Sequence, residues 1–191
     1  MNVMDVEDGY NQILRLFKQS GTKIGNTSEL INLTVRLPIG CKKLTHPSYS
    51  IKSNVLNEYI QQFVSSINYA EFPYTYGERI FNPNQVEMVI RRLKKDKYSR
   101  KAIIHTYRVD IDTYEEDIPC LQTIHFYIRD DKLQCTALFR SNDMLNAWIS
   151  NVNGLIYLSK IIARELNVGL GHLTTISTLA HVYLTEVDWY V

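Results

Sequence analysis

Cys120 and Arg140 are the residues whose types and spacing most favour nucleophilic chemistry. The cysteine comes just before a segment of β-branched and aromatic residues, 122–128, and the arginine follows a second such segment, 133–139. Residues 129–132 between them have turn composition, so we expect a hairpin that brings Cys120 and Arg140 side by side. A guanidinium lowers the pKa of a neighbouring thiol and favours the nucleophilic thiolate. The alternative is a small buried cysteine and a turn arginine.

Three further polar residues lie on elements that position them for chemistry. The segment 144–166 has the apolar pattern of a largely buried helix, and Asn151 falls on its apolar side. A buried amide needs partners, so Asn151 either ties up backbone or binds a ligand. His181 and Tyr183 are two residues apart in the expected strand 173–184, which places both on one face of a sheet.

Two charged features upstream each have a functional and a plain interpretation. Glu58 lies near the apolar side of an expected helix at 55–67, either at the edge of the apolar stripe or buried for a purpose. Arg100 and Lys101 come directly before an expected strand at 102–107, so their side chains point to opposite faces. They form either an anion clamp or ordinary surface decoration.

The other expected elements are simple. We expect a helix at 8–19, a polar turn at 24–29, a half-buried strand at 33–37, and loops at 41–54 and 71–81. A further helix is expected to begin with Asn82 as its cap and Pro83 in its first turn, and to end near Lys95. Gly169 and Gly171 are expected to end the long helix.

Composition predicts one soluble domain that covers residues 1–191. A net charge of +1 argues against a broad nucleic-acid or membrane surface, and no apolar run is long enough to span a membrane. Cys41, Cys120 and Cys135 form no CxxC pair, and no signal peptide is evident, so we expect free thiols in a reducing, cytoplasmic compartment. The histidines and cysteines lack metal-site spacing, so no metal is expected.

Taken together, Pro119-Cys120, the Arg140-Ser141-Asn142-Asp143 run, Asn151 and His181-Val182-Tyr183 resemble thymidylate synthases in order and spacing. The Tyr76-Gly77 pair and Ser99-Arg100-Lys101 also fit. The resemblance implies an α/β (α+β) fold, a twisted mixed β-sheet flanked by helices, with the sheets packed back to back in a homodimer. It also implies a methyltransferase of nucleotide biosynthesis. The enzyme would transfer a one-carbon unit from 5,10-methylenetetrahydrofolate to C5 of a pyrimidine nucleoside monophosphate, dUMP first.

The resemblance assigns a role to each candidate residue. Cys120 would attack C6 of the ring, and Glu58 would handle protons near O4. Asn151 would bind the N3/O4 edge of the ring, and Asp143 would orient the ring and the folate. The binding roles are a phosphate site of Arg140 and Ser141, a contact of Arg100 and Lys101 with the phosphate in the partner subunit, and a sugar-hydroxyl site of His181 and Tyr183. An activated thiol, fixed charges for a phosphate and an acid for proton transfer suit this chemistry.

Four departures from the family pattern bear on the reaction. Lys101 replaces an arginine, Ile80 replaces a tryptophan that helps to wall off the folate, and segment 23–27 offers no arginine to cover the phosphate. The chain also ends soon after Tyr183, so we expect the domain to lack the segment that closes over folate in the family. Loss of such a lid admits water to the site.

These departures leave alternatives open. Water that reaches the methylene intermediate before hydride gives a 5-hydroxymethyl pyrimidine, so the protein is alternatively a uridylate or (deoxy)cytidylate hydroxymethylase, an activity that the same family includes. Cytosine-specific members tend to carry aspartate where Asn151 stands, so Asn151 favours uracil, although its amide can turn to suit cytosine. A third possibility is a nucleotide-binding relative that has lost folate catalysis.

Overall fold

The computed structural model describes residues 1–49, 51–68 and 73–188. Its centre is a six-stranded mixed sheet with the order β1-β2-β6-β5-β4-β3. The strands are β1 Thr22–Ile24, β2 Thr27–Pro38, β3 Ile103–His105, β4 Leu121–Arg129, β5 Lys132–Asp143 and β6 Gly169–Tyr183. The helices are α1 Val6–Ser20, α2 Ser53–Val64, α3 Tyr76–Phe81, α4 Gln85–Lys95, α5 Val109–Asp112 and α6 Trp148–Leu166, followed by a 3₁₀ turn at Leu184–Glu186.

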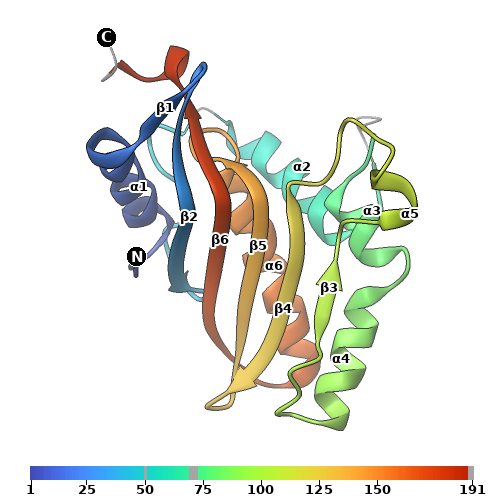
Figure 1. The fold of residues 1–191 in the computed structure, drawn as a ribbon. Coiled ribbons are helices and arrows are strands. Elements are labelled where there is room, and N and C mark those ends of the chain that lie inside the picture. Colours follow the sequence, from blue (N-terminus) through green and yellow to red (C-terminus); the bar gives the residue numbers. More distant parts are fainter. Residues whose placement is uncertain (50, 69–72, 189–191) are drawn as a thin grey trace.

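The helices gather on one face of this sheet. Figure 1 shows α2, α3, α4 and α6 behind the strands, while no helix among the described residues crosses the face turned to the viewer. This arrangement confirms the expected α/β fold with a mixed sheet flanked by helices. No helix in the described ranges is long and apolar enough to cross a membrane.

The long helix α6 connects the two parallel neighbours β5 and β6. A parallel pair needs such a crossover, because a short turn cannot return the chain to the starting end of the sheet. Nearly every residue of the first three turns of α6 is buried. Trp148 is fully buried, and its Nε1 donates a hydrogen bond to Thr175 Oγ1 of β6 at 3.3 Å. The helix therefore packs directly on the sheet that it connects.

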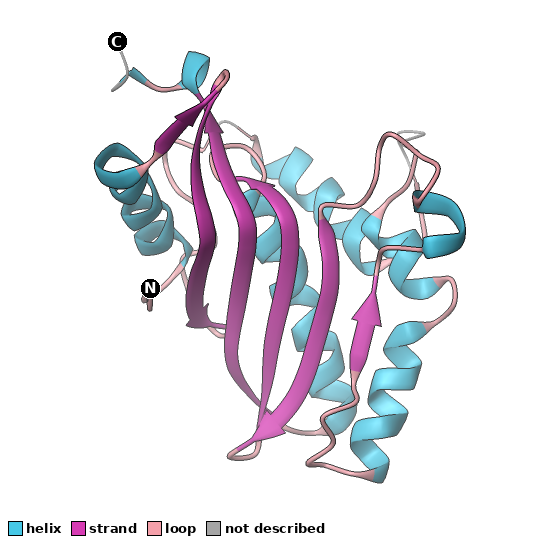
Figure 2. Cartoon of the chain, in the orientation of Figure 1, coloured by secondary structure: helices cyan, strands magenta, loops and turns pink. Residues whose placement is uncertain are grey.

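The expected hairpin is confirmed as β4 and β5. Figure 2 shows these two long strands side by side, joined by a short loop. Asp130 and Asp131 form that loop with φ angles of 51° and 56°. Such left-handed pairs make the tight turns whose twist matches that of the flanking strands, and aspartate tolerates them.

The central strands change the side on which their buried residues lie. After Phe139 the next buried residue of β5 is Asn142, and after Ser177 the next buried residue of β6 is Ala180. The register pairs Phe139 with Ser177 and Asn142 with Ala180, so both strands shift in the same row. A strand normally alternates with a period of two, so a skipped position exchanges the faces of all residues beyond it.

This exchange determines where several candidate site residues point. Without it, Ser141, His181 and Tyr183 would have continued the odd-numbered series that faces the helices. With it, they lie on the side away from the helical layer. In the neighbouring strand β2 the buried residues also change from even to odd positions in this row, at Asn32, which has a φ angle of 56°.

Several local predictions were wrong about where a helix lies, begins or ends. Residues 76–81 form helix α3 instead of loop, because Thr75 and Glu78 make a reciprocal capping box. Helix α4 is capped by Asn84 instead of Asn82, because the Asn84 side chain accepts a hydrogen bond from Glu87 N. The long helix begins at Trp148 rather than near 144.

The glycines expected to end that helix instead lie in β6. Asn167, with a φ angle of 52°, ends α6. Gly171 is needed for close packing on β5, since an added Cβ would lie 2.6 Å from the Leu133 carbonyl oxygen. The expected polar turn at 24–29 is the β1–β2 hairpin, with Gly25 at a φ angle of 59°.

Candidate active site

Cys120 and Arg140 lie side by side at the open end of the β4–β5 hairpin. The backbone N–H of Arg140 donates to the Cys120 carbonyl oxygen at 2.8 Å. The Arg140 guanidinium also donates to the chain just before the cysteine, from Nη2 to Ile118 O at 2.8 Å and from Nε to Pro119 O at 3.1 Å. The arginine is thus fixed to the loop that carries the thiol, as the hairpin predicted.

The electrostatic balance at Cys120 differs from the sequence-based expectation. Burial raises the pKa of the Cys120 thiol, and the positive charge of Arg140 opposes this rise without cancelling it. The predicted lowering of the thiol pKa was therefore wrong in its net direction, because the thiol is partly removed from water. Arg140 does act in the expected sense.

A cavity of about 620 Å³ opens beside the thiol. Its walls come from α2, from the segment leading into α3, from the loop before β4 and from β5. The lining residues are Val55, Glu58, Tyr59, Gln62, Phe63, Pro73, Tyr74, Thr75, Tyr76, Asp117, Ile118, Cys120 and Arg140. The volume lies within the range of small-molecule sites, and the mixture of aromatic walls and a few polar groups is typical of them.

Glu58 is exposed and lines this cavity with Cys120 and Arg140. This position matches the interpretation of Glu58 as a residue at the edge of the apolar stripe of α2. The structure therefore brings together three candidate residues from distant parts of the chain: an acid, a thiol and a cation.

Three tyrosines of the cavity wall were not among the predicted site residues. Tyr76 Oη accepts a hydrogen bond from the backbone N–H of Leu121, next to the cysteine, at 3.2 Å. Burial raises the pKa of Tyr76 and Tyr59, and it raises the pKa of Tyr74 to about 12, so all three phenols stay protonated at neutral pH. The sequence offered one signal for this group, the Tyr76-Gly77 pair, whereas Tyr59 has the spacing of an ordinary apolar helix position.

A second group of candidates lies on β5 and β6 and does not line this cavity. Ser141 Oγ and His181 Nδ1 are 3.3 Å apart and share a hydrogen bond. The rings of His181 and Tyr183 meet edge to face, with their centroids 5.4 Å apart, which confirms that they share one face. The parallel register places Asp143 opposite His181. One cluster at the C-terminal ends of β5 and β6 therefore contains Ser141, Asp143, His181 and Tyr183.

Asp143 makes local hydrogen bonds in this structure. Its carboxylate accepts from the backbone N–H groups of Leu145 and Asn146 at 2.9 and 3.0 Å, and from Asn146 Nδ2 at 3.0 Å. These bonds hold the turn between β5 and α6, which explains why the helix begins later than expected.

Asn151 is buried, with 3% of its surface exposed. Its amide meets two side chains: Oδ1 accepts from Tyr59 Oη at 2.6 Å, and Nδ2 donates to Asn142 Oδ1 at 3.1 Å. The Asn151 amide is therefore bound by two side chains rather than by backbone groups, and one of these side chains, Tyr59, lines the cavity.

The family model for thymidylate synthase matches residues 51–190. The chain belongs to the thymidylate synthase family. Proteins named "Putative thymidylate synthase" are similar to it. One from Methanothermobacter marburgensis is 32% identical and covers 96% of this chain and 92% of its own length. One from Methanosarcina mazei is 41% identical over 70% of this chain and 63% of its own length, and one from Methanocaldococcus jannaschii is 29% identical over 97% and 91%.

Two departures from the thymidylate synthase pattern can be located. Ile80, at the position of the expected tryptophan, is fully buried in the core and does not line the cavity. Arg100 and Lys101 are exposed and precede β3, whose Ile103 pairs with His125 of β4. Because the pair is antiparallel, residues before Ile103 lie toward the end of β4 that is far from Cys120, and neither residue lines the cavity of its own chain.

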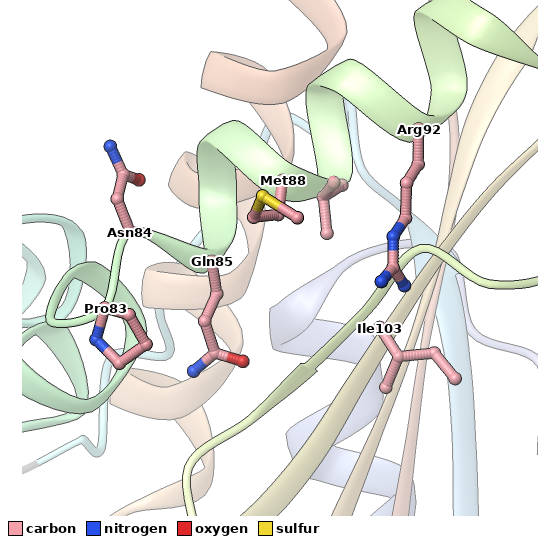
Figure 3. Close-up of a pocket in the computed structure, with 7 residues that line it drawn as sticks. Pro83, Asn84, Gln85, Met88, Arg92 and Ile103 are labelled. Carbon is pink, nitrogen blue, oxygen red and sulfur yellow. The ribbon is translucent and has the colours of Figure 1, made fainter.

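A second, smaller hollow of about 170 Å³ lies between α4 and β3 (Figure 3). Its lining includes Gln85, whose side-chain amide bonds both the N–H and the carbonyl of His105 on the edge strand. Arg92 also lines it and donates to the Lys101 carbonyl. These bonds satisfy backbone groups of an edge strand, so we interpret the hollow as part of the edge structure.

Proposed function

We propose that this protein is a thymidylate synthase-type transferase that adds a one-carbon unit to C5 of a pyrimidine nucleoside monophosphate, with dUMP as the first substrate to test. The observation that carries the proposal is the meeting of Cys120 and Arg140 at a cavity of about 620 Å³ that Glu58 also lines. Family membership supports the same reaction class.

The chemistry assigned to Cys120 is covalent. The thiol loses its proton, and Sγ then bonds to C6 of the pyrimidine while the π electrons of the C5–C6 bond move toward C5 and O4, which makes C5 nucleophilic. Arg140 favours the thiolate, as its effect on the pKa of Cys120 indicates. Glu58 is the cavity carboxylate assigned to proton transfer near O4.

The remaining candidates are assigned to binding. Arg140 and Ser141 would hold the phosphate, and His181 and Tyr183 the sugar hydroxyl. Ser141 and His181 already share a hydrogen bond, so these two subsites adjoin. Asn151 would bind the N3/O4 edge of the ring, and Asp143 would orient ring and cofactor.

We also propose a homodimer formed through the open face of the sheet. Ile31 of β2 and Leu179 of β6 are paired neighbours on that face, with 74% and 42% of their surfaces exposed, and Leu138 of β5 adds 38%. Apolar side chains gathered on an uncovered sheet mark an interface. Arg100 and Lys101, which lie away from the cavity of their own chain, would then serve the phosphate of the partner subunit.

The cavity walls fit the implied cofactor. Val55, Phe63 and Tyr74 line the cavity and contribute aliphatic and aromatic surface, which suits a pterin ring next to the pyrimidine. When bound, 5,10-methylenetetrahydrofolate supplies the one-carbon unit. The three free cysteines among the described residues support a reducing, cytoplasmic setting.

A hydroxymethylase is the second candidate, and the burial of Ile80 favours it. Without an aromatic wall at that position, less apolar surface separates the methylene intermediate from water. Uridylate or (deoxy)cytidylate would be the substrate. A nucleotide-binding relative without folate catalysis is the third.

One experiment separates these functions. Purified protein is mixed with methylenetetrahydrofolate and C5-tritiated dUMP or dCMP, tritium release is followed, and the product is identified by mass spectrometry. A methyl product supports the synthase and a hydroxymethyl product the hydroxymethylase. Release must vanish in Cys120→Ala and persist in the matched control Cys41→Ala. Nucleotide binding without tritium release in the wild type would leave only the binding relative.

A further inference from the structure

A chain of side-chain hydrogen bonds runs from the cavity wall into the sheet. Tyr59 Oη donates to Asn151 Oδ1 at 2.6 Å, Asn151 Nδ2 donates to Asn142 Oδ1 at 3.1 Å, and Asn142 Nδ2 donates to Ser177 Oγ at 3.2 Å. Asn142, Asn151 and Ser177 are all buried, and Tyr59 lines the cavity with Cys120. This hydrogen-bonded chain therefore links α2, α6, β5 and β6, and its Tyr59 end lies at the candidate site.

Among the described residues, the two side-chain bonds of Asn151 use half of the hydrogen-bonding capacity of its amide. A carboxamide has two acceptor positions and two hydrogens, and Tyr59 and Asn142 use one of each. The remaining acceptor and donor complement the N3–H and O4 of uracil. An amide turned by 180° would present the reverse order, which complements the N3 and amino group of cytosine. The orientation of Asn151 thus determines which base it can bind.

The two end residues of the hydrogen-bonded chain favour donation from Tyr59 toward Ser177 over the reverse direction. Tyr59 contributes a phenol, which is the more acidic hydroxyl and the better donor, while the alcohol of Ser177 is the better acceptor. Turning the Asn151 amide would require Tyr59 to accept and Ser177 to donate, and would reverse each bond of the chain. Burial raises the pKa of Tyr59, so its hydroxyl keeps the proton that it donates.

We propose that Tyr59 is a positioning residue that fixes the Asn151 amide, through its place in the Tyr59–Asn151–Asn142–Ser177 chain, in the orientation that selects uracil over cytosine. This inference rests on the proposed function, because it takes the substrate to be a pyrimidine nucleotide read by Asn151. It adds a base-selecting role for a tyrosine and a second asparagine that the site assignment had left out.

The test is the ratio of dissociation constants for dCMP and dUMP, measured by calorimetry on the full chain. In Tyr59→Phe the ring stays and the donor is lost, so the ratio should fall by about fivefold to tenfold, the effect of one hydrogen bond. Tyr157→Phe is the matched control, because Tyr157 is exposed on the same helix as Asn151 and its ratio should stay at the wild-type value.

Ser177→Ala tests the other end of the hydrogen-bonded chain and is nearly isosteric, so it serves as the test if Tyr59→Phe does not fold. It should also lower the ratio of the dissociation constants for dCMP and dUMP. A folded Tyr59→Phe or Ser177→Ala with the wild-type ratio would overturn the inference and leave the proposed function standing. A wild-type protein that binds both nucleotides equally would also overturn it. A wild type that binds neither nucleotide would overturn the inference and the proposed function together.

Discussion

The backbone N–H of Arg140 donates to the carbonyl oxygen of Cys120 at 2.8 Å, and the guanidinium of the same arginine binds the two carbonyls that precede the cysteine. The guanidinium charge and the Cys120 thiol are therefore held in one unit at the end of a hairpin. Arg140 need not reorganise to act on the thiol, and preorganised charge of this kind is more effective than charge that must first move into place.

The reactivity of Cys120 should depend on pH in a defined direction. Since burial raises the pKa of its thiol above the ordinary value, alkylation by iodoacetamide should keep increasing, by about tenfold per pH unit, to a pH above the midpoint of an exposed cysteine. Arg140→Met removes the opposing charge and should move the midpoint higher still. Arg129→Met, at the other end of the hairpin, is the control. Peptide mapping identifies the alkylated residue, and a midpoint below that of a free thiol would contradict the prediction.

The ion pair between Arg79 of α3 and Asp112 of α5 should contribute strongly to stability. Its atoms are 2.6 Å apart, the Asp112 side chain is 0% exposed, and Asp112 also accepts from Arg108 N at 2.6 Å. Asp112→Asn would leave the buried guanidinium without its counter-charge, which costs roughly 3–5 kcal/mol. Urea unfolding measures this loss.

The matched control is the exposed pair of Arg91 and Glu87 on α4. Glu87→Gln should change the free energy of unfolding by less than about 0.5 kcal/mol, because exposed pairs of this spacing are screened by water. Equal losses in the two variants would show that burial of the Arg79–Asp112 pair is unimportant. The pair also has a local consequence, since the Arg79 guanidinium lies 5.4 Å from the ring centroid of Tyr74 on the cavity wall.

Gly77 should tolerate no side chain. A Cβ at this position would lie 1.7 Å from the carbonyl oxygen of Ser65 and 2.5 Å from that of Gln62, so α3 begins in direct contact with the end of α2. Gly77→Ala must push these helices apart, which we expect to cost about 3 kcal/mol or more and to weaken nucleotide binding. Thermal unfolding and calorimetry give the two readouts. Gly40→Ala, whose nearest contact is 3.9 Å away, should be close to neutral.

The open face of the sheet should determine the oligomeric state. Leu179→Arg places a charge beside Ile31 in the centre of the proposed interface, so the protein should change from dimer to monomer in light scattering. Val109→Arg, on α5 outside the sheet, is an equally drastic change at an exposed apolar residue and should leave the dimer intact. A monomeric wild type, or a Leu179→Arg variant that remains dimeric, would remove the support for this interface.

Local sequence patterns predicted what local physics controls. The aspartates at 130 and 131 and the β-branched segments on either side predicted the hairpin, and the hairpin alone implied that Cys120 and Arg140 meet. The apolar periodicity of 144–166 predicted α6, and the spacing of His181 and Tyr183 predicted their shared face. Boundaries were less secure, because caps such as Asn84 and Asn167 depend on which of several polar residues makes the bond.

The sequence by itself therefore determined that the Cys120 thiol has a cationic neighbour, Arg140, and it indicated the family to which the chain belongs. Only the tertiary structure decided the rest. The exchange of faces in β5 and β6 directs Ser141 and His181 away from the helices, and burial outweighs Arg140 in its effect on the pKa of Cys120. The bond between Tyr59 and Asn151 joins residues 92 positions apart. Periodicity reports the face of one element, whereas burial and long-range hydrogen bonds depend on how several elements pack together.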